Sequence, residues 1–353
     1  MRALVSRPGT SGSTGVADVP EAADEGSVPV RTLEVGVCGT DREIAEGLFG
    51  TAPEGEERLV IGHELLGVVE RDAHGFARGD LVSATVRRSC GRCAPCLAGA
   101  PDACATGDYL ERGIVRLHGF AREVVFEHPE HLVPVPPSLG RLGVLAEPAS
   151  ICARGIRHAM AIGGRQPWTA ERALVLGAGA IGMISTVFLR LAGLEVWTAA
   201  REPSDAPAAG LARELGAAYA SVEEVPLADL RAETGGFDVV VEATVDAQAK
   251  VDAVGMLRRS GVCCLLGIDG RPGHVRIDRR VIGVDVVLEN RAVFGSVNAN
   301  RVDWLAAVED LDRARRRWPE ALERFVGLRV PVERWAEAFA HRGVKATLVF
   351  EEA

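Results

Sequence analysis

The sequence predicts an α/β fold of two domains, in which a compact, barrel-like β domain precedes a doubly wound parallel sheet. Three observations support this prediction. The chain has 353 residues, which is long for a single ordinary core. Its first 150 residues contain short runs of alternating polarity, whereas later residues alternate near-continuous apolar runs with helical patterns. A glycine-rich turn separates a strand from a helix near the start of the second part.

The first domain, residues 1–150, is rich in valine, glycine and proline. Period-two alternation is typical of half-buried strands, and clusters of turn-forming residues separate these runs. The expected strands lie at residues 34–37, 66–70, 80–86 and 123–126.

The second domain, residues 151–295, is expected to begin with a helix at 151–161. Its apolar runs are typical of parallel strands covered by helices on both faces. They lie at residues 173–176, 195–199, 238–241, 262–267 and 284–288. The remaining segment, 296–353, contains one amphipathic helix or two and then an apolar terminal strand at 345–350, which we expect to return to the first domain.

The composition limits the classes of partner. The formal charge of −9 and the pI near 5.5 argue against a nucleic-acid partner, which would favour a basic face. No apolar run reaches 18 residues and the N-terminus lacks the apolar core of a signal peptide, so neither a membrane span nor export is expected. We therefore expect a cytoplasmic protein whose eight cysteines are reduced and available for metal binding.

Four cysteines within a lobe at about residues 87–107 predict a closed metal site. Cys90, Cys93, Cys96 and Cys104 offer four thiolates, the ligand set of structural zinc. An iron–sulfur cluster is the alternative, but its usual motif places the fourth cysteine after three residues and before a proline. Here seven residues intervene and Ala105 follows. The spacing favours zinc that stabilises a loop and performs no chemistry.

A second, dispersed group of ligands predicts an open zinc site. Cys38 follows an apolar strand, His63 and Glu64 follow another, and Glu147 lies at the domain boundary. A thiolate, an imidazole and a carboxylate leave one coordination position for water or substrate, as in catalytic zinc sites. Thr40 could offer a hydroxyl to a substrate oxygen. Asp41 could accept a hydrogen bond from the imidazole and so orient it.

The glycine-rich turn predicts a dinucleotide site because it follows a strand and opens a helix. It would place a pyrophosphate at the helix N-terminus. Its residues are Gly177, Ala178, Gly179, Ala180, Ile181 and Gly182. The next strand ends in two alanines and Arg201 instead of the acidic residue that usually binds the ribose of NAD, which favours NADP. The adjacent Glu202 leaves NAD as a second cofactor.

The chain resembles the zinc-dependent medium-chain dehydrogenases over essentially its whole length, and within them the glucose dehydrogenase branch. The resemblance rests on Cys-Gly-Thr-Asp at 38–41, Gly-His-Glu at 62–64, the four-cysteine lobe, Glu-Pro-Ala-Ser at 147–150, the late glycine motif, and residues 109–114, 117–120 and 295–298. It implies a GroES-like catalytic domain formed by both ends of the chain and a Rossmann domain between them.

The resemblance also implies roles for individual residues. Cys38 and His63 would bind the catalytic zinc, with Glu64 and Glu147 competing for the third place, one directly and one through water or substrate. Sugar hydroxyls would be held by Thr40, Glu111, Glu147 and Asn298. We expect further cofactor contacts at Arg201, Thr244, Leu266, Gly267, Ser296 and Asn298.

The expected reaction transfers a hydride from C1 of an aldose, such as a glucose-like sugar, to NAD(P) and gives a lactone. Two functional alternatives remain: a polyol, amino-alcohol or other secondary-alcohol dehydrogenase of a biosynthetic pathway, and a non-catalytic NADPH-binding or sensor protein. Glu111 could instead pair with Arg112 or Arg116 on the surface, and Asn298 could be a turn residue. The apolar run at 292–297 could form a free sheet edge, consistent with a homodimer or homotetramer.

Overall fold

The computed structural model describes residues 1–21 and 25–350 and divides them into two compact units. Unit 1 comprises residues 1–150, 298–312 and 323–353, and unit 2 comprises residues 151–297 and 313–322. The predicted C-terminal segment is thus shared: most of it groups with unit 1, and a short helical stretch groups with unit 2. Within the described residues, no helix is long and apolar enough to cross a membrane.

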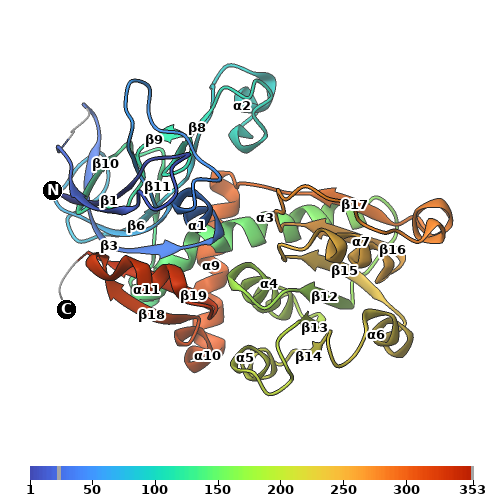
Figure 1. The fold of residues 1–353 in the computed structure, drawn as a ribbon. Coiled ribbons are helices and arrows are strands. Elements are labelled where there is room, and N and C mark those ends of the chain that lie inside the picture. Colours follow the sequence, from blue (N-terminus) through green and yellow to red (C-terminus); the bar gives the residue numbers. More distant parts are fainter. Residues whose placement is uncertain (22–24, 351–353) are drawn as a thin grey trace. The chain divides into compact units, whose positions relative to one another are not determined.

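Unit 1 is built on a seven-stranded sheet with the order β11-β6-β5-β3-β19-β18, in which β10 also pairs with β3 (Figure 1). Two three-stranded sheets accompany it, with the orders β2-β1-β4 and β7-β8-β9. Its strands are β1 (Arg2–Ser6), β2 (Gly15–Asp18), β3 (Val28–Val37), β4 (Leu59–Val60), β5 (Glu64–Val69), β6 (Leu81–Ala84), β7 (Arg87–Arg88), β8 (Leu110–Arg112), β9 (Arg116–Leu117), β10 (Val124–Glu127), β11 (Leu132–Pro134), β18 (Val326–Pro331) and β19 (Lys345–Val349).

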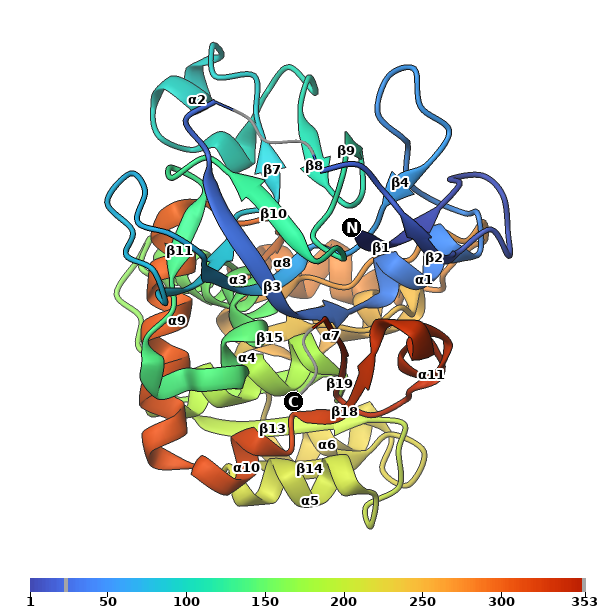
Figure 2. The same ribbon diagram turned by 90° about the vertical axis from the view of Figure 1, so that its left-hand side faces the viewer.

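The last described strand, β19, lies between β3, with which it pairs antiparallel, and the edge strand β18 of the unit 1 sheet. Figure 2 shows β3, β19 and β18 side by side. The strand β3 pairs antiparallel with β5, β10 and β19, and eight of its ten residues are buried. Two ends of the sequence therefore contribute to one core.

Unit 2 contains a six-stranded, all-parallel sheet with the order β14-β13-β12-β15-β16-β17. This is the order of a doubly wound sheet, whose switch point lies between β12 and β15. The strands are β12 (Arg172–Leu176), β13 (Glu195–Ala200), β14 (Ala218–Ser221), β15 (Phe237–Glu242), β16 (Leu257–Leu265) and β17 (Ala292–Gly295). All six residues of β15 are buried, as expected of a central strand covered on both faces.

Helices connect the strands of both units. Helices of the chain are α1 (Gly39–Ala45), α2 (Ala94–Leu97), α3 (Ala146–Gly163), α4 (Ala180–Leu191), α5 (Pro207–Glu214), α6 (Leu227–Thr234), α7 (Ala247–Gly255), α8 (Val286–Leu288), α9 (Arg301–Arg317), α10 (Pro319–Glu323) and α11 (Trp335–Ala340). Single 3₁₀ turns lie at Pro101–Ala103 and Val332–Arg334, and a longer 3₁₀ segment lies at Pro137–Leu145.

One strand prediction is wrong. Residues 284–288 are apolar enough for a buried strand, but the structure forms helical turns at Val281–Asp285 and Val286–Leu288. Their Val287 and Leu288 side chains are 66% and 67% exposed, so the run is a surface and not a core element. The sixth strand of the sheet is Ala292–Gly295. The short strand β14 had no clear sequence signal and was not predicted.

Candidate active site

Cys38 lies at the junction of β3 and α1, where the helix start fixes its position. The backbone N–H of Cys38 donates to Asp41 Oδ2 at 2.9 Å, which closes a capping arrangement around the first turn. His63 immediately precedes β5 and is buried. Its Nε2 lies 3.2 Å from the Cys38 sulfur, so the structure brings these two predicted ligands together.

Asp41 lies on the other side of the imidazole. Its Oδ1 is 3.6 Å from His63 Nδ1, a distance for an ion pair that is longer than a hydrogen bond. Neither of these two buried atoms has a hydrogen-bond partner within the described residues. The expected orienting hydrogen bond is therefore not formed at this separation. Burial would lower the pKa of His63, but the neighbouring Cys38 and Asp41 raise it well above its usual value.

Both candidate carboxylates lie beside His63. Ligand atoms of His63, Glu64 and Glu147 lie within 4.8 Å of one another, and all three residues are buried. Glu64 has a cationic partner, because Lys345 Nζ donates to both of its oxygens at 2.7 Å. None of the described residues donates a hydrogen bond to the Glu147 carboxylate, and burial raises the pKa of Glu147 to about 7 despite the nearby imidazole.

This arrangement fits a divalent cation. The half-buried Cys38 thiol and the Glu147 carboxylate each lie within 4.8 Å of the His63 imidazole, and desolvation raises the pKa of Cys38. Buried ionisable groups of this kind are stable as anions only when paired or coordinated. The donor set of sulfur, nitrogen and oxygen is that of catalytic zinc sites with an open position.

Lys345 was not predicted, although it belongs to this site. It is one of only two lysines in the chain and comes from β19, 281 residues after Glu64. Its Nζ also approaches the carbonyl oxygen of Val37 at 3.4 Å. Gly36 makes room for the pair, since a Cβ there would lie 1.9 Å from Glu64 Oε2. The sequence feature that could have indicated Lys345 is a single lysine at the start of an otherwise apolar strand.

The predicted substrate residues Glu111 and Asn298 are in contact. Asn298 Nδ2 donates to Glu111 Oε1 at 2.9 Å, although the two residues are 187 positions apart. Asn298 has a left-handed backbone with φ of 63°, which agrees with the alternative interpretation of this residue as a turn residue. Thr40 lies in the first turn of α1, two residues after Cys38, and is half-buried.

The alternative partners considered for Glu111 are wrong. Its partner is Arg87, whose Nε and Nη2 both lie 3.0 Å from Glu111 Oε1. Arg112 instead pairs with the buried Glu127 at 3.0 Å, and Arg116 lies 3.9 Å from Asp108. The antiparallel register of β7 and β8 places Arg87 directly opposite Glu111.

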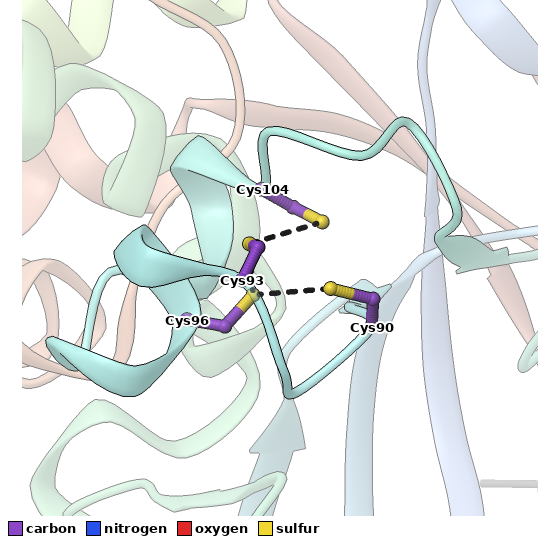
Figure 3. A group of neighbouring side chains, drawn as sticks. All are labelled: Cys90, Cys93, Cys96 and Cys104. Atoms are coloured by element: carbon purple, nitrogen blue, oxygen red, sulfur yellow. Dashed lines mark hydrogen bonds between the residues drawn. The ribbon is translucent and has the colours of Figure 1, made fainter.

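The four cysteines of the lobe converge on one point (Figure 3). The Cys93–Cys96 sulfur distance is 3.3 Å, and the Cys90–Cys96 and Cys93–Cys104 distances are each 3.9 Å. A tetrahedral ion with zinc–sulfur bonds of about 2.3 Å would set such distances at about 3.8 Å. A hydrogen bond with Thr106 lowers the pKa of Cys104 to about 5, which favours the thiolate. The lobe therefore fits a closed zinc site.

The glycine motif of unit 2 adopts the predicted strand–turn–helix form. Gly177 ends β12 with a φ of 106°, and a Cβ at Gly182 would lie 1.9 Å from the Gly177 carbonyl oxygen. A Cβ at Gly179, by contrast, would meet nothing within 4 Å. Since Gly179 precedes the first turn of α4, this open space fits a pyrophosphate held by helix N–H groups. Ala178, Ala180 and Ile181 complete the turn.

The other predicted cofactor residues of unit 2 follow the carboxyl ends of its strands. A cleft there is lined by residues that include Gly177, Arg201, Glu202 and Thr244. The Arg201 guanidinium has no ion-pair partner within the described residues, whereas Glu202 and Glu223 line the same cleft. Two predicted positions, Leu266 and Gly267, follow β16, and Ser296 follows β17. Asn298 belongs to unit 1.

Family models cover nearly the whole chain. Residues 24–137 match the alcohol dehydrogenase GroES-like domain, and residues 140–350 match the glucose dehydrogenase C-terminus. The first of these is the fold expected for the catalytic domain.

Curated relatives and solved structures agree. The glucose 1-dehydrogenase of Methanocella arvoryzae is 43% identical, with 94% of each chain covered. Glucose 1-dehydrogenase 1 of Caldivirga maquilingensis is 38% identical over 99% of this chain and 98% of the relative. The structure of Haloferax mediterranei glucose dehydrogenase in complex with NADP, Zn and gluconolactone has a TM-score of 0.91 at 31% identity and covers all of both chains. The chain therefore belongs to the glucose dehydrogenase branch of the zinc-dependent medium-chain dehydrogenases, with a GroES-like domain and a Rossmann domain.

Proposed function

We propose that this protein is a zinc-dependent glucose 1-dehydrogenase that oxidises the C1 hydroxyl of glucose to the lactone and reduces NADP. The observation that carries the proposal is the donor set of Cys38, His63 and Glu147, in which the buried imidazole has a ligand atom of Cys38 and one of Glu147 each within 4.8 Å. A non-catalytic NADPH-binding relative would be expected to lack one of these donors. Relatives named glucose 1-dehydrogenase support the choice of an aldose.

Glu147 is our choice for the third ligand of the catalytic zinc. Glu64 already has both oxygens bonded to Lys345, which would compete with a metal for the same lone pairs. Glu147 has no such partner among the described residues. Glu64 would then act from behind the site as a buried countercharge.

The residues of unit 1 would bind the sugar and remove its proton. Zinc supplies Lewis-acid polarisation of a substrate oxygen, and the nicotinamide accepts the hydride. The Thr40 hydroxyl would accept the C1 hydroxyl proton at Oγ1 and give its own proton to water. Glu111 and Asn298 would bind the remaining sugar hydroxyls.

The lobe and the cleft of unit 2 would hold the other groups. Cys90, Cys93, Cys96 and Cys104 would bind a second, structural zinc, because four thiolates leave no open position. The free Arg201 guanidinium suits the 2′-phosphate of NADP, while Glu202 suits the ribose hydroxyl of NAD. We therefore infer a preference for NADP with some use of NAD.

The test is a substrate panel. Aldoses, polyols and acyclic secondary alcohols are offered with NADP and with NAD, and the reduced nicotinamide is followed by absorbance. Glucose with NADP should give the highest kcat/KM. Activity confined to acyclic secondary alcohols would reject the aldose assignment. His63→Ala should abolish turnover and leave NADP affinity nearly unchanged, since the nucleotide cleft belongs to unit 2.

A homodimer or homotetramer in the cytoplasm is the state that we propose. The strand β17 ends the parallel sheet; Val293 on it is 40% exposed, and the nearby apolar Val287 and Leu288 are 66% and 67% exposed. An exposed apolar sheet edge favours pairing with a second copy. All eight cysteines are free thiols, which suits a reducing compartment. Sedimentation equilibrium of the wild type and of Val293→Glu tests the assembly; a monomeric wild type would reject it.

A further inference from the structure

We propose that Arg87 is a positioning residue that orients Glu111 for the sugar and couples the four-cysteine lobe to substrate binding. This inference rests on the proposed function, because it requires Glu111 to bind a sugar hydroxyl. It assigns to the lobe a role beyond the stabilisation of a loop.

The two oxygens of Glu111 are in different situations. Oε1 accepts hydrogen bonds from Arg87 Nε at 3.0 Å and Asn298 Nδ2 at 2.9 Å, and Arg87 Nη2 also lies 3.0 Å from it as an ion pair. Two hydrogen bonds and this close cation leave Oε1 little capacity for another donor. Within the described residues, Oε2 accepts no hydrogen bond, so it is the oxygen that remains for a substrate hydroxyl. Arg87 and Asn298 together thus fix which oxygen is free.

The guanidinium of Arg87 is itself fixed by the lobe. Its Nη1 donates to the carbonyl oxygen of Asp102 at 2.8 Å. Asp102 lies in the 3₁₀ turn Pro101–Ala103, directly before the fourth cysteine ligand, Cys104. The guanidinium also stacks on the Tyr109 ring at 3.9 Å from its centroid. Through these contacts the guanidinium of Arg87 links Asp102 of the lobe to Glu111 on β8.

Only a planar, forked side chain can make these contacts together. Arginine offers parallel N–H donors to a carboxylate and a third donor in another direction, and it stacks on an aromatic ring. Lysine presents one compact ammonium and cannot do all three. The side chains of Arg87 and Glu111 are only 10% and 12% exposed, so solvent screens this pair much less than a surface salt bridge.

The strand that carries Glu111 also packs against the segment of the catalytic ligands. Gly113, two residues after Glu111, approaches Gly62, the residue before His63; a Cβ at Gly113 would lie 2.5 Å from the Gly62 carbonyl oxygen. The backbone N–H of Phe120 donates to the same carbonyl at 2.8 Å. A shift of β8 would therefore displace Glu111, which we propose to bind the substrate, and would disturb the segment that bears His63. Loss of the lobe metal should reach the substrate site along this route.

The decisive experiment compares three arginine variants of the metal-loaded enzyme. Arg87→Met removes the fork, Arg87→Lys keeps the charge, and Arg92→Met is the matched control. Arg92 is another arginine of the lobe, but it is exposed and pairs with Asp108 at 3.0 Å. We expect Arg87→Met and Arg87→Lys to raise KM for glucose at least tenfold, with kcat within threefold and KM for NADP unchanged. Arg92→Met should leave all three constants as in the wild type.

Two further measurements separate positioning from folding. The dissociation constant for gluconolactone, measured by calorimetry on the NADP complex, should rise with KM in both Arg87 variants. In a Glu111→Gln background, Arg87→Met should change KM less than twofold, because both changes remove the same function. Should Arg87→Met be unfolded, Arg87→Lys carries the comparison, since it retains the charge and most of the volume.

The outcomes separate the two proposals. If the wild type oxidises glucose and the Arg87 variants bind glucose and gluconolactone normally, the positioning role is wrong and the proposed function stands. Additive effects of Arg87→Met and Glu111→Gln on KM for glucose would also overturn the positioning role. If the wild type does not oxidise glucose at all, the proposed function fails, and this inference fails with it.

Discussion

Replacement of Lys345 by methionine should destabilise unit 1 strongly. The ion pair of Lys345 and Glu64 is nearly inaccessible, with side-chain exposures of 3% and 2%. Removal of one partner leaves a buried carboxylate without its cation, which typically costs about 3–5 kcal/mol. For a unit of this size, each kcal/mol lowers the melting temperature by about 2–4 °C, so we expect a decrease of about 6–20 °C.

The assay is scanning calorimetry of the zinc-loaded protein at neutral pH. The double variant Lys345→Met, Glu64→Gln should recover at least half of the loss, since it removes the unpaired charge together with its partner. Lys250→Met is the matched control, because Lys250 is the other lysine of the chain. Its ammonium lies 3.7 Å from Glu242 and its side chain is 19% exposed, so its removal should cost less than half as much.

A melting temperature of Lys345→Met within 2 °C of the wild type would refute the reasoning, because the pair would then contribute nothing. Equal losses in Lys345→Met and in the double variant would also refute it, since packing of the lysine stem, and not its charge, would be responsible. Zinc content should be measured on the same samples. Lys345→Met should retain the lobe metal, because the four cysteine ligands of that metal lie in the lobe and not on β19.

Three other perturbations test the remaining sites. Gly179→Ala should fold normally, since its Cβ meets no atom within 4 Å, but should weaken NADP binding at least tenfold in a fluorescence titration; Gly210→Ala, in equally open space, should bind normally. Cys93→Ser should reduce zinc from two to one per chain by elemental analysis and lower the melting temperature. Stability should fall from about pH 6.5 to pH 4, because burial and the nearby Arg88 lower the pKa of His131 to about 4, so that the unfolded chain binds the proton first. His131→Asn should reduce this loss in the free energy of unfolding by at most about 2–3 kcal/mol. If calorimetry shows the same loss in the variant, the acid sensitivity belongs to other groups.

Local chemistry explains what could be predicted from the sequence. The four cysteines and the glycine turn each lie within 15 residues or fewer, so spacing alone constrains their geometry. The strands of unit 2 were found where burial on both faces gives continuous apolar runs. The failure at residues 284–288 has the same origin: an apolar run on an exposed surface has the same pattern as a buried strand.

Partners that are distant in sequence could not be predicted. Nothing near Glu64 indicates Lys345, and nothing near Glu111 indicates Asn298, 187 positions later. For Glu111, proximity in sequence suggested Arg112 or Arg116 as the ion-pair partner. The antiparallel register of β7 and β8 places Arg87 opposite Glu111 instead. Register is set by pairing across a sheet, which a single sequence does not reveal.

The discontinuous course of unit 1 has a chemical consequence at the catalytic site. Residues 1–150 supply every proposed ligand of the catalytic zinc, together with two neighbouring acids, Asp41 and Glu64, and the three carboxylates are buried. This segment alone would concentrate negative charge that burial does not tolerate. The returning strand β19 brings the ammonium group of Lys345 to Glu64. The same ammonium group donates to the carbonyl oxygen of Val37, the residue before Cys38. Because Lys345 donates to both oxygens of Glu64, Glu147 is the carboxylate that we propose for the metal. In this proposal the C-terminal strand decides which acid would bind zinc, although it contributes no ligand itself.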